Sequence, residues 1–170
     1  MGNFRNVINR IGLKLRADFR ADQPKAPMLF SAPPPEIAPR VLVVDDNASQ
    51  RAIIATLVAD LGWGLSAAEN GAEGVATCAN AGPFDLILMD YRMPVMDGGE
   101  ATRKIRALGG WAASVPIIGA TADWNPALHR WCLQAGMTEC VAKPVQPLAL
   151  AELMRRTLSP LGRIRNRAAG

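Results

Sequence analysis

Five polar residues follow directly after short apolar runs of this chain. Two are the adjacent acids Asp45 and Asp46, and the others are Asp90, Thr121 and Lys143. Three carboxylates that meet repel one another, so they persist only with shared protons or a bound cation. An all-oxygen site that is partly open to water suits Mg²⁺ better than zinc or copper. These residue types therefore predict a magnesium site, with an ammonium and a hydroxyl beside it.

Phosphoryl transfer is the chemistry that these groups favour. Once a metal is seated, Asp90 remains ionised and can attack phosphorus as a nucleophile, which forms an acyl phosphate. The phosphoryl oxygens then need partners besides the metal, and Lys143 offers an ammonium while Thr121 offers a hydroxyl. Lys143 precedes Pro144, so the peptide bond between them is a candidate for the cis form, which would fix the direction of the lysine.

The elements that must position these residues follow from the pattern of apolar runs. From Arg40 onward, short apolar runs alternate five times with amphipathic helical segments. We expect strands at residues 41–44, near 65, at 85–89, at 115–120 and at 139–142, and helices at about 48–61, 71–80, 98–108, 126–135 and 146–158. Three of these runs are continuously apolar, as in central parallel strands that are covered on both faces.

This alternation predicts an α/β fold: a doubly wound parallel sheet of five strands in the order 2-1-3-4-5. In such sheets, function lies at the carboxyl ends of the strands, and this order makes the first and third strands neighbours. We therefore expect Asp45, Asp46 and Asp90 to converge in one crevice.

Five stretches of the chain match one protein family in order and spacing. They are VLVVDDN at 41–47, ENGAEG at 69–74, LILMDYRMPVMDGGEATRKIR at 86–106, IIGATA at 117–122 and AGMTECVAKP at 135–144. Over about residues 40–158 the chain therefore resembles a response-regulator receiver domain, which is CheY-like and has a flavodoxin-like fold. The MPVMDG motif is especially similar to receivers attached to hybrid sensor kinases.

The resemblance implies a single-domain response regulator or phosphorelay receiver. It would accept a phosphoryl group on Asp90 from a histidine kinase or histidine phosphotransfer protein, and its output would be an altered contact with a downstream protein. Asp46, Asp90 and the backbone carbonyl of Arg92 would bind Mg²⁺ directly, and Asp45 would act through water. The family implies a phosphoacceptor rather than an enzyme, with slow Mg²⁺-dependent autophosphotransfer and autodephosphorylation.

Two further roles and one departure come with the resemblance. Thr121 would be the switch hydroxyl, and Lys143 would contact the phosphoryl group. The family often has Tyr or Phe three residues before this lysine, where rotation of the ring reports phosphorylation, but Cys140 stands there in this chain. We therefore expect output through the loop after Thr121 or through another surface.

An apolar stripe runs along the fourth predicted helix. Trp124, Leu128 and Trp131 lie at helical spacing, whereas Cys132 and Leu133 are expected to face the core. Two interpretations of the stripe remain open, an interaction surface and local packing.

Basic arms flank an acidic centre. Through Arg40 there are seven Lys and Arg residues against three acids, and from Arg155 onward there are five Arg residues and no acid, within a net charge of +4. We predict a basic amphipathic segment at 1–20, a Pro-rich linker at 21–39, the receiver domain at 40–158 and an Arg-rich tail at 159–170. For the first segment, docking on the stripe, binding to an anionic membrane surface and a role as a leader all remain open.

The Arg-rich tail and the N-terminal segment leave alternative functions open. Closely spaced Arg side chains can clamp phosphates in bidentate fashion, so a CheY-like effector that binds cyclic di-GMP is one alternative. A localisation adaptor that uses the N-terminal helix is another. DNA binding is not expected, because no helix-turn-helix pattern follows residue 158.

The compartment is predicted from what the sequence lacks. No apolar stretch approaches the roughly 20 residues that span a bilayer, and the N-terminus lacks an apolar signal core. We therefore expect a cytoplasmic protein. Cys78, Cys132 and Cys140 have neither CxxC nor Cys/His spacing, so we expect reduced, mostly buried thiols rather than a disulfide framework or a zinc site.

Overall fold

The computed structural model describes residues 38–123 and 125–159 of the 170 in the chain. The predicted basic segment at 1–20, nearly all of the Pro-rich linker, Trp124 and the tail from Pro160 lie outside the described residues. The roles predicted for them remain predictions. Among the described residues, no helix combines the length and the apolar character needed to cross a membrane.

A parallel five-stranded sheet forms the centre of the described part. Its strands are β1 (Arg40–Val44), β2 (Gly64–Ala68), β3 (Leu86–Asp90), β4 (Ile117–Thr121) and β5 (Glu139–Ala142). They are ordered β2-β1-β3-β4-β5, and every neighbouring pair is parallel. The predicted fold class and strand order are confirmed, with β1 and β3 hydrogen-bonded to each other.

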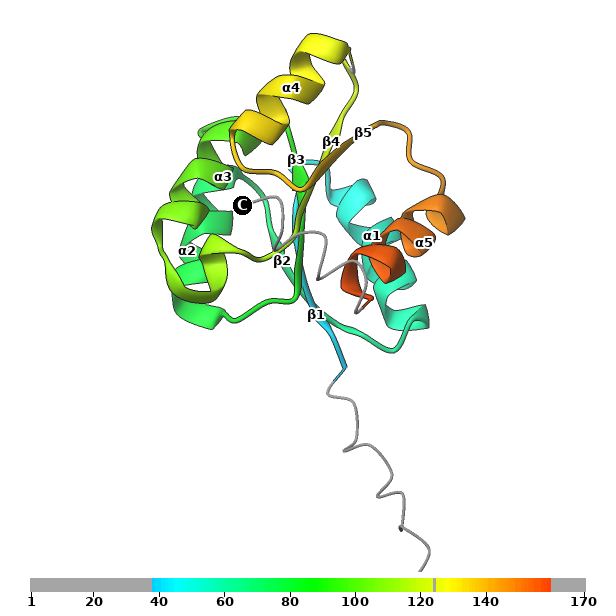
Figure 1. Ribbon diagram of the computed structural model, residues 1–170. Helices are drawn as coiled ribbons and strands as arrows, with labels where there is room; N and C mark the ends of the chain where they lie inside the picture. Colours follow the sequence, from blue (N-terminus) through cyan, green and yellow to red (C-terminus); the bar gives the residue numbers. More distant parts are fainter. Residues whose placement is uncertain (1–37, 124, 160–170) are drawn as a thin grey trace, which may run out of the picture. The chain divides into compact units, whose positions relative to one another are not determined.

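Helices cover both faces of this sheet (Figure 1). They are α1 (Ala48–Asp60), α2 (Gly71–Ala81), α3 (Gly98–Ala107), α4 (Pro126–Gln134) and α5 (Pro147–Leu158), with a short 3-10 helix η2 (Gly110–Ala113) before β4. Figure 1 shows α1 and α5 on one side of the sheet, and α2, α3 and α4 on the other. The predicted helices are correct to within one or two residues, whereas η2 was not predicted.

The fourth strand begins later than the sequence pattern suggested. We predicted a strand from residue 115, but β4 begins at Ile117. Pro116 has no backbone N–H to give to a strand ladder, and only its carbonyl takes part, accepting a hydrogen bond from the Ile87 N–H at 2.9 Å. The proline therefore sets the start of the strand.

Each of the first four helices begins with a side chain that caps its free N–H groups. Asn47 caps α1, Asn70 caps α2, Asp97 caps α3 and Asn125 caps α4, and each side chain accepts a backbone N–H from the first turn of its helix. Such caps typically contribute about 1 kcal/mol each. Because each cap lies shortly after the carboxyl end of a strand, it also fixes the loop that carries site residues.

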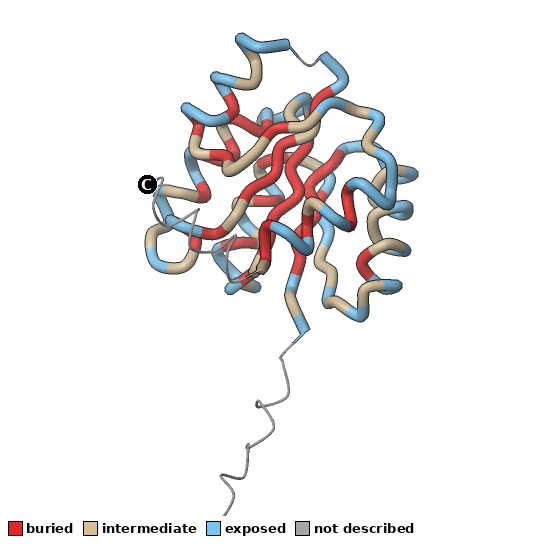
Figure 2. The backbone as a smooth tube through the Cα atoms, turned by 45° about the vertical axis from the view of Figure 1, so that its right-hand side comes forward, coloured by how far each residue is buried: buried red, intermediate tan, exposed pale blue. Residues whose placement is uncertain are grey.

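The core is split into two layers by the sheet. Alternate residues of the central strands face α1 and α5, where Val43, Leu88 and Met154 are buried together. Their sequence neighbours face the other layer, where Val44, Met89 and Ile105 are buried. Figure 2 shows the resulting band of buried backbone through the centre. Burial of each such side chain contributes about 1.5–3 kcal/mol, so the strand ends are held in a rigid frame.

Candidate magnesium and phosphoryl site

The three predicted acids meet at the carboxyl edge of the sheet. Asp45 and Asp46 follow β1 directly, and Asp90 is the last residue of β3. One carboxylate oxygen from each of the three lies within 4.8 Å of the others. Asp45 and Asp90 are buried and Asp46 is exposed. The predicted convergence is thus present, and the cluster is open on the side of Asp46.

Lys143 brings a positive charge into this cluster. It follows β5 directly, and the Lys143–Pro144 peptide bond is cis, as predicted. Its Nζ donates to Oδ2 of Asp45 at 2.8 Å and lies 2.9 Å from Oδ2 of Asp90. One ammonium therefore bridges two of the three carboxylates.

The charges at the site are only partly compensated. Burial raises the pKa of Asp90 above its ordinary value; the hydrogen bond and charge of Lys143 oppose this rise, and the charge of Asp45 adds to it. Burial lowers the pKa of Lys143, but its hydrogen bonds to Asp45 and Asp90 and their charges outweigh burial, so its pKa lies above the ordinary value. The lysine thus stays protonated, while the Asp90 carboxylate would gain from a further cation.

Thr121 is the fifth member of the predicted set. It ends β4, is fully buried, and pairs in register with Ala142, the residue before the lysine. The Lys143 N–H donates to the Thr121 carbonyl at 2.8 Å. The Thr121 Oγ1 accepts a hydrogen bond from the Asp123 N–H at 3.3 Å, and a hydroxyl that accepts one bond can still donate another. The hydroxyl is therefore coupled to the loop that leads into α4.

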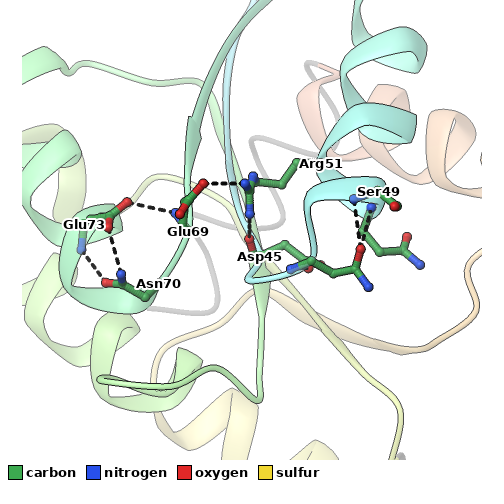
Figure 3. Close-up of polar contacts among 8 residues, drawn as sticks. Asp45, Ser49, Arg51, Glu69, Asn70 and Glu73 are labelled. Atoms are coloured by element: carbon green, nitrogen blue, oxygen red, sulfur yellow. Dashed lines mark hydrogen bonds and ion pairs between the residues drawn. The ribbon is translucent and has the colours of Figure 1, made fainter.

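A polar network supports the loop that carries Asp45. The Asn47 N–H donates to Asp45 Oδ1 at 2.9 Å, and Arg51 donates to the Asp45 carbonyl at 2.8 Å. Figure 3 shows Arg51 reaching from there to Glu69, whose own N–H donates to Glu73. The sequence reading did not single out Arg51, although its place one turn into the helix after two acids was a usable signal. The network ties the ends of β1 and β2 together.

The loop after Asp90 packs closely against its backbone. A Cβ atom on Gly98 would collide with the Asp90 carbonyl oxygen, and it would also lie 3.0 Å from Met89 and from the backbone of Tyr91. Within this loop, Val95 has a φ of 70°, and the Met96 N–H bonds to the Pro94 carbonyl across it at 2.8 Å. A positive φ in a β-branched residue is strained, so this tight turn is held by its surroundings.

Arg92 lies at the edge of the site. Its backbone N–H donates to the Asp90 carboxylate, which favours the charged form. Its side chain forms an exposed ion pair with Asp123 at 2.9 Å. The loops after β3 and β4 are thereby joined, and the Arg92 backbone carbonyl remains a predicted magnesium ligand.

Comparisons with known proteins agree with this geometry. Residues 41–155 match the family model described as the response regulator receiver domain. The chain belongs to the receiver domain family. It is 40% identical over 122 residues to the sensor protein GacS of Pseudomonas syringae pv. syringae, a match that covers 69% of this chain but 13% of GacS. The chain thus spans a small part of the length of such relatives.

Solved structures show the same fold. The receiver domain of the sensor histidine kinase PA1611 from Pseudomonas aeruginosa PAO1, which has a magnesium ion coordinated in its active site cleft, is 36% identical. It aligns with a TM-score of 0.65 over 71% of this chain and 98% of that chain. A chain in the co-crystal structure of the Saccharomyces cerevisiae phosphotransfer protein Ypd1 with the Ssk1 receiver domain is 29% identical, with a TM-score of 0.64 over 70% of this chain and 88% of that one.

The acids of this receiver domain fit a magnesium ion. Their oxygens lie within 4.8 Å of one another, a spacing that oxygen ligands of one small divalent cation can share. Asp46 is exposed, so water can complete the coordination that Mg²⁺ prefers. Burial is the main cause of the raised pKa of Asp90, and a divalent cation beside this carboxyl would favour its charged form. Asp45, Asp46 and Asp90, with the Arg92 carbonyl, would hold the ion.

A cavity of about 250 Å³ opens from the site of the receiver domain toward α1 and α5. Asp45, Asp90 and Lys143 form its polar end, and Ile53 of α1 and Leu150 of α5 are among its apolar lining. Ile53 is 51% exposed. An apolar surface therefore adjoins the carboxylates, while Thr121 and Asp46 are outside the cavity lining.

The stripe on α4 of the receiver domain is divided. Leu128 is partly buried against the core layer of α2 and α3, whereas Trp131 is 66% exposed. Cys132 faces the core as predicted, but the prediction for Leu133 was wrong, because this side chain is 42% exposed. Adjacent residues of a helix point about 100° apart, so only one of this pair can face the sheet. The interaction surface remains a prediction, with Trp131 as its exposed described member.

Proposed function

We propose that this receiver domain takes a phosphoryl group onto Asp90 from a histidine kinase or a histidine phosphotransfer protein. The observation that carries the proposal is the meeting of Asp45, Asp46 and Asp90 within 4.8 Å, with the Lys143 ammonium 2.9 Å from Asp90. A buried carboxylate beside a fixed ammonium and a metal-binding set is equipped for nucleophilic attack on phosphorus.

Each group of the site has a defined part in the transfer. Bound Mg²⁺ supplies positive charge to the carboxylates and to the phosphoryl oxygens. An Asp90 oxygen attacks phosphorus, so a P–O bond forms while the P–N bond to the donor histidine breaks, and the released imidazole is left on the donor. Lys143 moves its ammonium from Asp90 to a phosphoryl oxygen, and the Thr121 hydroxyl donates to another. Slow attack by water at the same phosphorus returns the Asp90 carboxylate.

The donor protein docks over the cavity between α1 and α5. This face adjoins Asp90, carries the exposed Ile53, and is lined by apolar side chains that a partner helix can cover. The yeast protein Ypd1 was crystallised with the Ssk1 receiver domain, which supports a phosphotransfer protein as the occupant. The docked donor would bring its histidine to the polar end of the cavity.

Output runs through the loop between β4 and α4. When the Thr121 hydroxyl turns to the phosphoryl group, it gives up the hydrogen bond from the Asp123 N–H. Asp123 also pairs with Arg92 of the neighbouring loop, so both loops respond. The exposed Trp131 on α4 is then the candidate contact for a downstream protein.

Labelling with a small phosphodonor tests the proposal. Wild-type protein incubated with radiolabelled acetyl phosphate and Mg²⁺ should incorporate acid-stable, base-labile label, and incorporation should stop when Mg²⁺ is chelated. Asp90→Asn should remove the label, whereas Asp60→Asn, which alters an exposed acid at the end of α1, should retain it. Undiminished labelling of Asp90→Asn would refute the assignment. Phosphotransfer profiling against the histidine kinases of the host would then name the donor.

A further inference from the structure

Two buried thiols lie together outside the phosphoryl site. Cys132 comes from α4 and Cys140 from β5, and their exposed fractions are 0% and 4%. Their Sγ atoms are 3.0 Å apart. A disulfide bond is about 2.05 Å long, so the sulfur atoms are roughly 1 Å from bonding distance. The two thiols are thus close enough to form a disulfide bond with each other after a small movement.

A glycine in the next strand leaves space beside Cys140. Cys140 pairs in register with Gly119 of β4. A Cβ on Gly119 would lie 2.5 Å from the Met137 sulfur and 3.5 Å from the Cys140 sulfur. The sulfur atoms of Met137 and Cys140 therefore occupy the space that a side chain at position 119 of β4 would fill.

The packing of α4 against the sheet depends on Cys132. Cys132 is the one buried residue of the helix in the described part of the chain, and Leu128 and His129 are partly buried. Helix α4 otherwise presents exposed side chains, among them Trp131 and Leu133. A covalent bond at Cys132 would therefore fix a helix that few buried contacts hold in place.

We propose that Cys132 and Cys140 are a redox-modification site, at which a low-molecular-weight disulfide such as oxidised glutathione drives formation of an intramolecular disulfide that tethers α4 to β5. The thiolate of one cysteine attacks the small disulfide, forms a mixed disulfide and releases one small thiol. The second cysteine then attacks the protein sulfur of that mixed disulfide and displaces the other small thiol. Two protein S–H bonds are lost, one S–S bond forms, and two electrons and two protons pass to the small disulfide.

Access to the thiols sets the rate of this reaction. Burial raises the pKa of Cys140 to about 12 and raises the pKa of Cys132, so little thiolate is present in the closed structure. Oxidation therefore needs α4 to lift from the sheet, and it is slower than oxidation of an exposed cysteine. The sequence pattern predicted reduced, buried thiols, which describes the state before this reaction.

Peptide mapping tests the bond directly. The reduced full-length protein is incubated with oxidised glutathione, unfolded in N-ethylmaleimide, digested with a protease that cleaves after Glu139, and analysed by mass spectrometry. We expect a cross-linked peptide pair containing Cys132 and Cys140, lighter by two hydrogens and free of maleimide, while Cys78 is alkylated. The cross-link should persist in a Cys78→Ala variant and vanish in a Cys140→Ala variant. Maleimide on all three cysteines, glutathione retained without a cross-link, or a cross-link to Cys78 would overturn the proposal.

Hydrogen exchange tests the tether in the same samples. Oxidation should slow exchange of the α4 amides by about tenfold or more, because the bond prevents the helix from lifting. The amides of α2, on the same face of the sheet (Figure 1), serve as the control and should be unchanged. Reduction with dithiothreitol should restore fast exchange. Equal exchange of α4 in the oxidised and reduced proteins would contradict the tether.

Discussion

At the scale of single residues, the site is a balance between two buried carboxylates and one ammonium. Asp45 and Asp90 share Lys143 at 2.8 and 2.9 Å, and the exposed Asp46 adds a third negative charge nearby. A buried charge whose partner is removed is costly. The lysine therefore has a structural role in the metal-free protein, beside the chemical role that we propose for it in phosphoryl transfer.

Replacement of Lys143 tests its role in balancing the charges of the carboxylates. Lys143→Met should lower the free energy of unfolding by about 2 kcal/mol without Mg²⁺, because both carboxylates lose their counter-charge. Added Mg²⁺ should restore part of the loss, since it binds the folded acids. Urea unfolding with and without Mg²⁺ measures both effects. Lys104→Met, which removes an exposed pair with Glu100, should cost less than about 0.5 kcal/mol. Equal losses in the two variants would argue against the charge balance.

The site residues were predictable because each one follows a strand. Asp45, Asp90, Thr121 and Lys143 stand at the ends of separate apolar runs, and parallel strands place such ends together. The contact of Arg51 with Glu69 was not predicted, because it reaches the end of β2, which the local pattern around Arg51 does not report. The magnesium and phosphoryl roles themselves stay proposals.

At the scale of elements, the loop between β3 and α3 determines how the Asp90 backbone is held. Gly98 opens α3, and its N–H donates to the Tyr91 carbonyl at 2.9 Å. The missing side chain lets the first turn of the helix lie against the carbonyl of Asp90. The position of the Asp90 backbone thus depends on a glycine that has no side chain to take part in chemistry.

A methyl group at this glycine should disturb both stability and labelling. Gly98→Ala should lower the free energy of unfolding by about 2 kcal/mol, because the added Cβ forces the loop away from Asp90. It should also reduce labelling by acetyl phosphate. Gly64→Ala is the matched control, since its Cβ would come no nearer than 3.8 Å to another atom, and it should leave both quantities almost unchanged. Normal labelling of Gly98→Ala would show that the close packing is dispensable.

Element types were predicted better than their limits. Alternation of apolar and amphipathic segments identified all five strands and five helices of the described part. The start of β4 was missed because it depends on Pro116. The short helix η2 was missed because it depends on the glycines at 109 and 110, whose φ values are positive. Local backbone chemistry decided these limits, and hydrophobic periodicity does not report it.

At the scale of the whole molecule, the two faces of the sheet carry different surface features. The face of α1 and α5 holds the cavity that adjoins Asp90. The opposite face holds α4 with the exposed Trp131 and the thiol pair. In the proposed function, the sheet separates input from a donor and output to a target, and the loop after Thr121 connects them.

A charge on the donor face should separate protein donors from small ones. Ile53→Glu places a carboxylate at the rim of the cavity, so phosphotransfer from a histidine phosphotransfer protein should fall by about tenfold or more, while labelling by acetyl phosphate is kept. Leu108→Glu, beyond the end of α3, is the control because Leu108 is also exposed but is not part of the cavity lining. Phosphotransfer rates measure the outcome. An equal fall for both donors would point to damage of the site instead.

Asp90 is the residue that we propose carries the phosphoryl group. Borohydride reduces an aspartyl phosphate to homoserine, so the modified residue can be read from peptide masses. Wild-type protein phosphorylated with acetyl phosphate and Mg²⁺, then reduced and digested, should show homoserine at residue 90 alone. Homoserine at Asp45, Asp46 or another acid, with Asp90 intact, would contradict the account.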